Sequence, residues 1–193
     1  HYGSNDNKFI VPGTDEPIEV PKGVAHFLEH KMFEQENGKN SLDVLTSIGV
    51  NANAYTTNDH TAYLYECTDN FYEALDEFMD YVQHPYFTDK NVEKEKGIIG
   101  QEIKMYDDYP EWRVYLNALE AMYYKNPVKL DITGTVETIS HIDKDILYKC
   151  YNTFYNPSNM CMVISGDFEP EKLIEEIKKR LLNTSQNGEI KRI

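Results

Sequence analysis

The sequence predicts an α+β fold in which a mostly antiparallel sheet is covered by helices. Two adjacent stretches, 50–57 and 61–67, alternate in polarity around a polar turn, as the strands of a hairpin do. Several longer stretches carry apolar residues at helical spacing. Residues 160–165 form a continuous apolar stretch suited to the centre of a sheet.

Length and charge restrict the class of protein. With 193 residues, the chain is long enough for one domain with a real core, and we expect a single catalytic-type domain over 1–193. The hydrophobic content of 40% is that of a globular chain. The net charge of −14 argues against nucleic acid and membrane as partners. It permits a basic peptide as a partner, although an acidic surface more often only keeps a protein soluble.

The cysteines and the chain ends suggest where the protein works. The three cysteines, Cys67, Cys150 and Cys161, are odd in number and match no zinc-knuckle spacing, so we expect reduced thiols and a cytoplasmic location. No apolar run reaches transmembrane length, and no signal peptide is recognisable. Because the chain begins at His1, we expect a fragment or a processed product, from which an upstream signal or anchor could have been lost.

Caps and helix breakers give the elements in order. The prolines and glycines of 1–22 predict a strand end near Lys8–Val11 and then a loop. Pro21 and Gly23 set the start of an apolar helix that ends near Phe33. Further helices are expected over 42–47, 71–84, 89–109, 112–124, a short turn from 138, 144–153 and 170–182, with N-caps at Asn40, Asp69-Asn70, Thr88 and Asp143. The polar tail after Asn183 is expected to be frayed.

One face of the first helix carries the candidate chemistry. His26, Glu29 and His30 lie three and four residues apart, so their side chains share that face. Two imidazoles at i and i+4 can bind one metal ion, and the carboxylate at i+3 stands beside it; the pattern is H-x-x-E-H. The competing interpretation is a buried helix with one packed and one surface histidine. A catalytic zinc needs a third protein ligand from elsewhere.

That third ligand is expected on the helix over 89–109. Glu95 and Glu102 lie seven residues apart and share a face with the apolar Ile98 and Ile99. Periodicity alone does not separate these two carboxylates, and a solvated helix face explains them equally well.

The strand before the turn is a candidate peptide-binding edge. Asn53, Ala54 and Tyr55 lie in a stretch of small and polar residues that buries little. An edge strand near a metal site can pair with an extended peptide by strand addition. An ordinary hairpin strand is an equally good interpretation.

These segments resemble the insulinase/pitrilysin family of zinc metallopeptidases with the inverted motif, which includes the mitochondrial processing peptidase. The finer detail is similar to a bacterial branch with members named for a link to elongation factor P modification. The similarity covers nearly the whole chain. It lies in the metal helix, the asparagine-alanine-aromatic edge and its partner, the second ligand helix and the closing region, which are residues 23–30, 53–56 with 61–63, 93–102, and 134–135 with 155–160 and 166–167.

The resemblance implies roles for the candidate residues. It makes Glu102 the third zinc ligand with His26 and His30, and Glu95 a carboxylate that supports catalysis without binding the metal. Glu29 then acts as general base on the attacking water of a metalloendopeptidase, whose peptide substrate lies on Asn53-Ala54-Tyr55.

The departure from the family is length. Family members have two halves, each of two similar domains, whereas we expect this chain to hold one domain that lacks its first strands. We therefore expect the remaining domains of the same chain, or a homologous partner subunit, as a partner, and weak activity without it. Two other functions stay open, namely a peptide-binding subunit without activity and a non-peptidase hydrolase that shares the metal motif.

Overall fold

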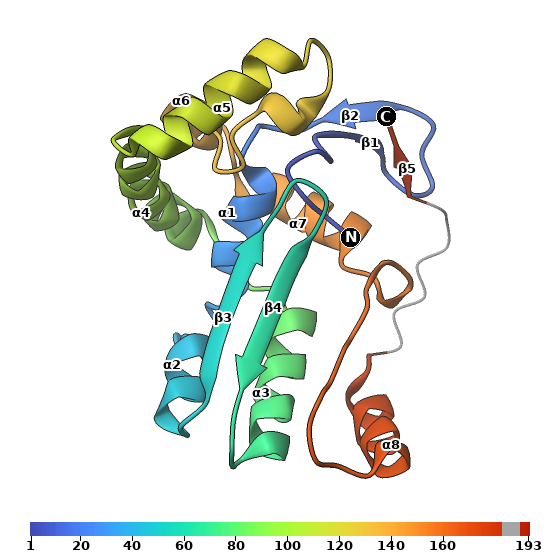
Figure 1. Ribbon diagram of the computed structural model, residues 1–193. Coiled ribbons are helices and arrows are strands. Elements are labelled where there is room, and N and C mark those ends of the chain that lie inside the picture. Colours follow the sequence, from blue (N-terminus) through green and yellow to red (C-terminus); the bar gives the residue numbers. More distant parts are fainter. Residues whose placement is uncertain (183–189) are drawn as a thin grey trace.

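The computed structural model describes residues 1–182 and 190–193. Its strands form two small antiparallel sheets (Figure 1). The first, in the order β2-β1-β5, contains Pro17–Glu19, Lys8–Ile10 and Lys191–Arg192. The second pairs β3 (Asn51–Thr56) with β4 (Thr61–Glu66) in a six-residue register.

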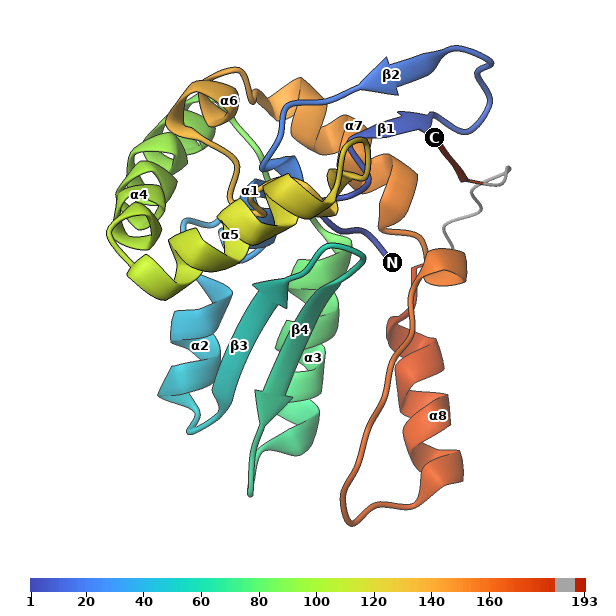
Figure 2. The same ribbon diagram turned by 45° about the horizontal axis from the view of Figure 1, so that its top comes forward.

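Helices make up most of the remaining described structure. They are α1 (Val24–Lys31), α2 (Ser41–Ser47), α3 (Phe71–Gln83), α4 (Asp89–Asp107), α5 (Pro110–Met122), α6 (Val136–Ser140), α7 (Lys144–Phe154) and α8 (Pro170–Arg180), with 3₁₀ turns η1 (Pro127–Lys129) and η2 (Pro157–Asn159). In Figures 1 and 2, α1 lies between α4 and α7, with the β3–β4 hairpin below it. The predicted α+β class is confirmed, with two small sheets in place of one larger sheet. No helix in the described part of the chain is long and apolar enough to cross a membrane.

Helix α1 lies at the centre of the core. Seven of its eight residues are buried, which leaves His30 as the partly exposed member. The helix packs against β3, β4, α4 and α7. Since its apolar residues Val24, Phe27 and Leu28 are at most 1% exposed, hydrophobic burial fixes the position of the helix that carries the candidate residues.

Most predicted helix caps are present. The side chains of Asn40, Thr88 and Asp143 accept hydrogen bonds from backbone N–H groups of the first turn, and Thr88 forms a capping box with Asn91. Asn70 differs. It starts α3 in the left-handed conformation with φ 59°, and its amide donates to the Ile48 carbonyl instead of capping the helix.

Three predictions about extended segments are corrected. Residues 1–22 hold a second strand, β2, which pairs with β1 where a loop was expected. The predicted strand Met160–Ser165 has no strand partner among the described residues, and Val163 is 86% exposed. An apolar stretch becomes a strand only when a neighbour satisfies its backbone. Residues 183–189 of the predicted frayed tail lie outside the described residues, but Lys191–Arg192 pair with β1 and are not frayed.

Two glycines fix the start of α1 against the loop before α6. Gly23 has φ 90°, and a Cβ on it would lie 2.5 Å from the Thr133 carbonyl oxygen. Gly134 has φ 72°, and a Cβ there would lie 2.6 Å from the Lys22 carbonyl oxygen. Both the backbone conformation and the close approach therefore require glycine.

We expect Gly23→Ala to destabilise the protein by about 1–3 kcal/mol more than Gly13→Ala, because the added methyl group clashes with a packed backbone. Gly13 is the matched control, since its φ is also positive, 87°, but a Cβ there would meet nothing within 4 Å. Urea unfolding of both variants measures the difference. Equal losses of stability would mean that the approach to Thr133 is not a constraint.

Candidate metal centre

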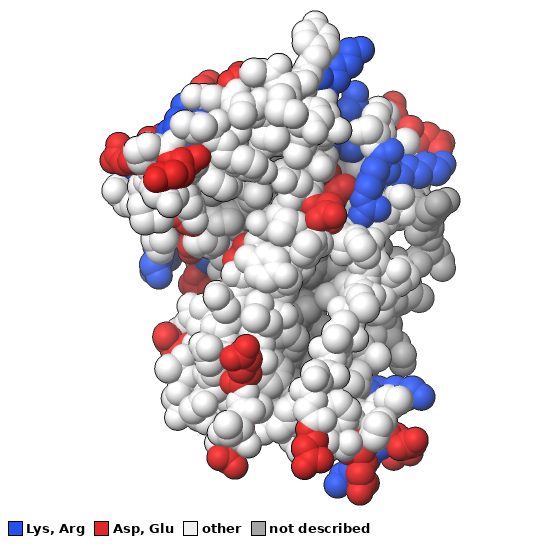
Figure 3. All heavy atoms as spheres, in the orientation of Figure 1, with Lys and Arg blue, Asp and Glu red and all other residues white. Residues whose placement is uncertain are grey.

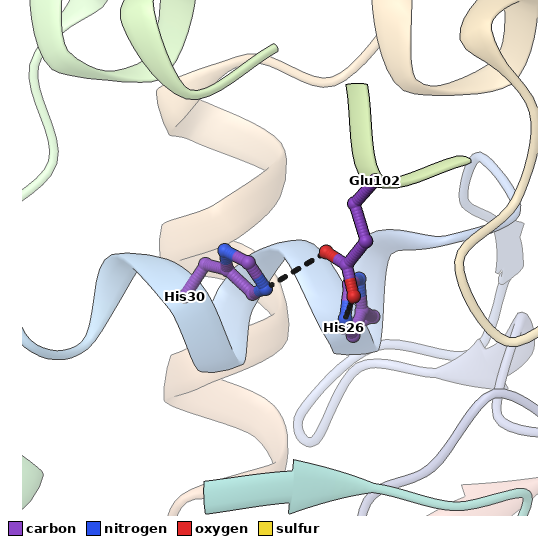
Figure 4. A group of neighbouring side chains, drawn as sticks. All are labelled: His26, His30 and Glu102. Carbon is purple, nitrogen blue, oxygen red and sulfur yellow. Dashed lines mark ion pairs between the residues drawn. The ribbon is translucent and has the colours of Figure 1, made fainter. Parts of the chain in front are cut away.

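Three predicted residues from two helices meet at one point. His26 and His30 project from successive turns of α1, and Glu102 reaches them from α4 (Figure 4). Glu102 Oε1 lies 3.6 Å from His26 Nε2, and Glu102 Oε2 lies 3.4 Å from His30 Nε2. One potential ligand atom of each residue lies within 4.8 Å of the other two.

This arrangement fits a metal ion. Ligands about 2.1 Å from a tetrahedral ion lie about 3.4 Å from one another, close to the distances from the two Glu102 oxygens to His26 Nε2 and His30 Nε2. Two imidazole nitrogens and one carboxylate form the donor set of several catalytic zinc sites, which keep further positions open. His26 Nδ1 is buried and has no hydrogen-bond partner among the described residues, so the polar contact of this imidazole is made through Nε2, toward the other two ligands.

The charges at the site favour a bound cation. Burial and the nearby His30 lower the pKa of His26 to about 4. Burial also acts to lower the pKa of His30, but the contacts with Glu102 and Glu95 outweigh it and raise this pKa to about 9. The hydrogen bond with His30 holds the pKa of Glu102 below its usual value, against its burial. Without a metal, a proton on His30 therefore supplies the positive charge beside two carboxylates.

Glu29 lies on the same side of α1 with its own support. Burial raises the pKa of this carboxyl group, against the opposing effect of a hydrogen bond from Thr56. The Thr56 hydroxyl, at the end of β3, donates to Glu29 Oε2 over 2.6 Å. A carboxylate with a raised pKa accepts protons more readily near neutral pH. Thr56 was not among the residues predicted from the sequence, although it directly follows the predicted Asn53–Tyr55 edge.

Glu95 contacts the other side of His30. Its Oε1 lies 3.1 Å from His30 Nδ1, and its Oε2 lies 3.7 Å from Lys31 Nζ. Burial acts to raise the pKa of Glu95, but the hydrogen bond with His30 and the charge of Lys31 lower it overall. Periodicity did not separate Glu95 from Glu102; in the structure, Glu102 alone of the two joins the three-residue group.

A cavity lies between His30, one of the three residues of this centre, and the β3 strand. It has a volume of about 870 Å³ and is lined by α1, the following loop, α2, β3 and α4. Glu29, His30, Asn53, Ala54 and Glu95 all line it. Among the described strands, β3 pairs on one side only, with β4, and the Ala54 N–H donates to the Asn53 side chain instead of to β4. The predicted edge thus faces the cavity.

Tyr55 is the exception among the predicted edge residues. Its side chain is 49% exposed, does not line the cavity, and contacts His60 edge to face. The structure therefore does not place Tyr55 at the cavity in which the other two predicted edge residues lie.

Two family models match the chain. The model of insulinase, peptidase family M16, matches residues 16–136, which contain all the candidate residues. The model of the peptidase M16 inactive domain matches residues 141–192.

Similar proteins agree with this match. The chain is 53% identical over 178 residues to YmfH of Bacillus subtilis, named as an uncharacterized zinc protease; the match covers 92% of this chain and 41% of the relative. Identity with the beta subunit of the mitochondrial-processing peptidase of Caenorhabditis elegans is 28% over 177 residues, which cover 89% of this chain and 38% of that subunit.

A solved structure shares the fold. The crystal structure of a protein from Alicyclobacillus acidocaldarius, described as an M16-like peptidase, superposes with a TM-score of 0.92 and 43% identity. The superposition covers 100% of this chain and 45% of that one. The chain thus spans less than half the length of the relatives it matches.

Proposed function

Because the chain belongs to the insulinase family of peptidases, peptidase family M16, we propose that it carries the zinc site of a metalloendopeptidase that cleaves extended peptides. The observation that carries the proposal is the meeting of His26, His30 and Glu102, with Glu29 on the same face of α1. The relatives named as zinc proteases support the same choice of metal.

His26, His30 and Glu102 would hold the zinc ion, through the nitrogens and the carboxylate that already face one another. A zinc ion bound there supplies a Lewis acid that polarises the scissile carbonyl and acidifies water. Glu95 would orient the His30 ring through its contact with Nδ1, the ring nitrogen that faces away from Glu102.

Glu29 carries the proton. Its buried carboxylate takes a proton from the attacking water and delivers it to the leaving amine. The hydroxyl of Thr56 donates a hydrogen bond to Glu29 Oε2. The other oxygen, Oε1, is therefore the one that accepts the proton. The raised pKa of Glu29 favours the first of these two steps.

The free edge of β3 would bind the substrate backbone. An extended peptide that adds to this edge replaces the Asn53 side chain as the partner of the Ala54 N–H. Glu29 and His30 line the same cavity as Asn53 and Ala54, so a peptide in this register passes the candidate centre.

A second half, in the same chain or in a homologous subunit, would complete the enzyme. Three observations support it. The chain spans less than half of its relatives, and the apolar segment Met160–Ser165 is largely exposed, running along the β4 side of the sheet in Figures 1 and 2. Figure 3 shows charged side chains at the top, along the left margin and at the bottom of this face, with few of them at its centre right.

The alternative is a peptide-binding subunit without activity. The inactive-domain model favours it for part of the chain, but the matched residues 141–192 include none of the candidate site residues. A subunit that only binds peptide has no need of His26, Glu29, His30 and Glu102 together. We therefore prefer the active enzyme.

We expect about one zinc ion per chain in the purified protein, and its loss in Glu102→Gln and in His26→Ala, because each change removes a ligand. Elemental analysis measures the zinc. Glu93→Gln is the matched control, since this exposed residue lies on the same helix and outside the three-residue group. Zinc retained at the wild-type level in Glu102→Gln would contradict the assigned ligands.

We expect Glu29→Gln to keep its zinc and to slow peptide hydrolysis by about 10²–10⁴-fold, because the amide cannot accept the proton. A panel of peptides, assayed with and without a chelator on the chain together with its second half, provides the rates. Hydrolysis by Glu29→Gln at the wild-type rate would refute the mechanism. A wild-type protein that, together with its second half, binds zinc and peptide but cleaves none of the panel would favour the binding subunit.

We expect the second half to protect the Cys161 thiol from a thiol reagent, because this exposed residue lies within the apolar 160–165 segment. Cys161→Ser identifies its signal, and the buried Cys150 provides an internal control. Labelling rates are compared between this chain alone and the chain together with its second half. Equal rates for Cys161 would show that the partner binds elsewhere.

A further inference from the structure

Lys31 is a buried lysine beside the candidate metal centre. It is the last residue of α1, and its relative exposure is 0%. Lysine is rarely buried unless it is paired. Here its ammonium group forms ion pairs with Glu34 and with Glu95, and it also lies at the negative end of the helix dipole. The burial of this charge is therefore compensated within the structure.

The Glu95 carboxylate is held at both of its oxygens. Oε1 lies 3.1 Å from His30 Nδ1, while Oε2 lies 3.7 Å from Lys31 Nζ. His30 and Lys31 are neighbours at the end of α1, so one carboxylate from α4 holds two adjacent residues of α1. With a partner on each oxygen, the carboxylate group has a fixed orientation.

The two histidines differ in this support. His26 Nδ1 has no hydrogen-bond partner among the described residues, so no polar contact supports this ring on the side away from Glu102. The His30 ring has a carboxylate on Nδ1 and faces Glu102 through Nε2. A carboxylate on the far nitrogen orients a metal-binding imidazole and strengthens it as a ligand.

We propose that Lys31 is a positioning residue of the metal centre: its ammonium group holds the Glu95 carboxylate against His30 Nδ1, and so directs His30 Nε2 toward the metal. The inference rests on the proposed zinc site. His30 donates its Nδ1–H to Glu95, which leaves the Nε2 lone pair for the ion. Lys31 touches neither substrate nor metal and acts through Glu95 and His30.

The test is the zinc affinity of Lys31→Met, which removes the ammonium group and keeps an unbranched apolar side chain. We expect zinc to bind about 10–100-fold more weakly, as for other losses of outer-shell support. Competition with a chromophoric chelator measures the affinity. Lys90→Met is the matched control, because it removes the same charge from the same helix as Glu95, from an exposed side chain with no ion pair among the described residues. It should bind zinc as the wild type does.

The visible spectrum of the cobalt(II)-substituted protein reports ligand geometry separately from stability. We expect an altered spectrum in Lys31→Met and a nearly normal one in Lys31→Arg, which keeps a cation for Glu95. A role in stability alone would lower the unfolding temperature and leave zinc affinity and spectrum unchanged. Should Lys31→Met fail to fold, Lys31→Gln, which keeps a hydrogen-bond donor without the charge, is measured in the same way.

A double-mutant cycle establishes the route through Glu95. If Lys31 acts through Glu95, Lys31→Met should weaken zinc binding little further in a Glu95→Gln background. Fully additive losses, or wild-type affinity in Lys31→Met or Lys31→Gln, would overturn the inference while the zinc site stands. A wild-type protein that binds no zinc would instead refute the proposed function.

Discussion

The packing of α4 against α1 is the constraint on which the candidate site depends, because it places the Glu102 carboxylate between two imidazoles. Burial of almost the whole of α1 fixes that helix, and the glycine contact at Gly23 fixes where it starts. Its polar residues then each meet a partner from another element. Thr56 of β3 holds Glu29, and Glu95 of α4 holds His30. The helix therefore cannot rotate or slide without breaking several of these contacts at once.

Much of the candidate site could be predicted from the sequence, because H-x-x-E-H spacing on one helix is a local property. The choice between Glu95 and Glu102 could not be made locally, since residues seven apart share a face. The structure separates the two carboxylates by the position of α4 along α1. This position brings Glu102 to His30 Nε2 and Glu95 to His30 Nδ1. Lys31 was missed for a related reason, because its burial depends on carboxylates that tertiary packing brings to it.

The helices were predicted better than the strands. The start of a helix can be predicted from a capping residue such as Asn40, Thr88 or Asp143. Each of these side chains accepts a hydrogen bond from a residue only two or three positions later in the sequence. Strands depend on neighbours distant in sequence. The β1 strand pairs with β5 across the whole length of the chain, and the apolar 160–165 segment stays unpaired among the described residues because nothing there completes its hydrogen bonds.

The most direct measurement of the central claim is anomalous diffraction from crystals of the protein on both sides of the zinc absorption edge. It locates zinc without reference to activity or to any variant. We predict one anomalous peak among His26 Nε2, His30 Nε2 and the Glu102 carboxylate, with Glu95 on Nδ1 of His30 and outside the ligand set. A zinc ion bound by Glu95 instead of Glu102, or bound away from α1, would contradict this account of the site.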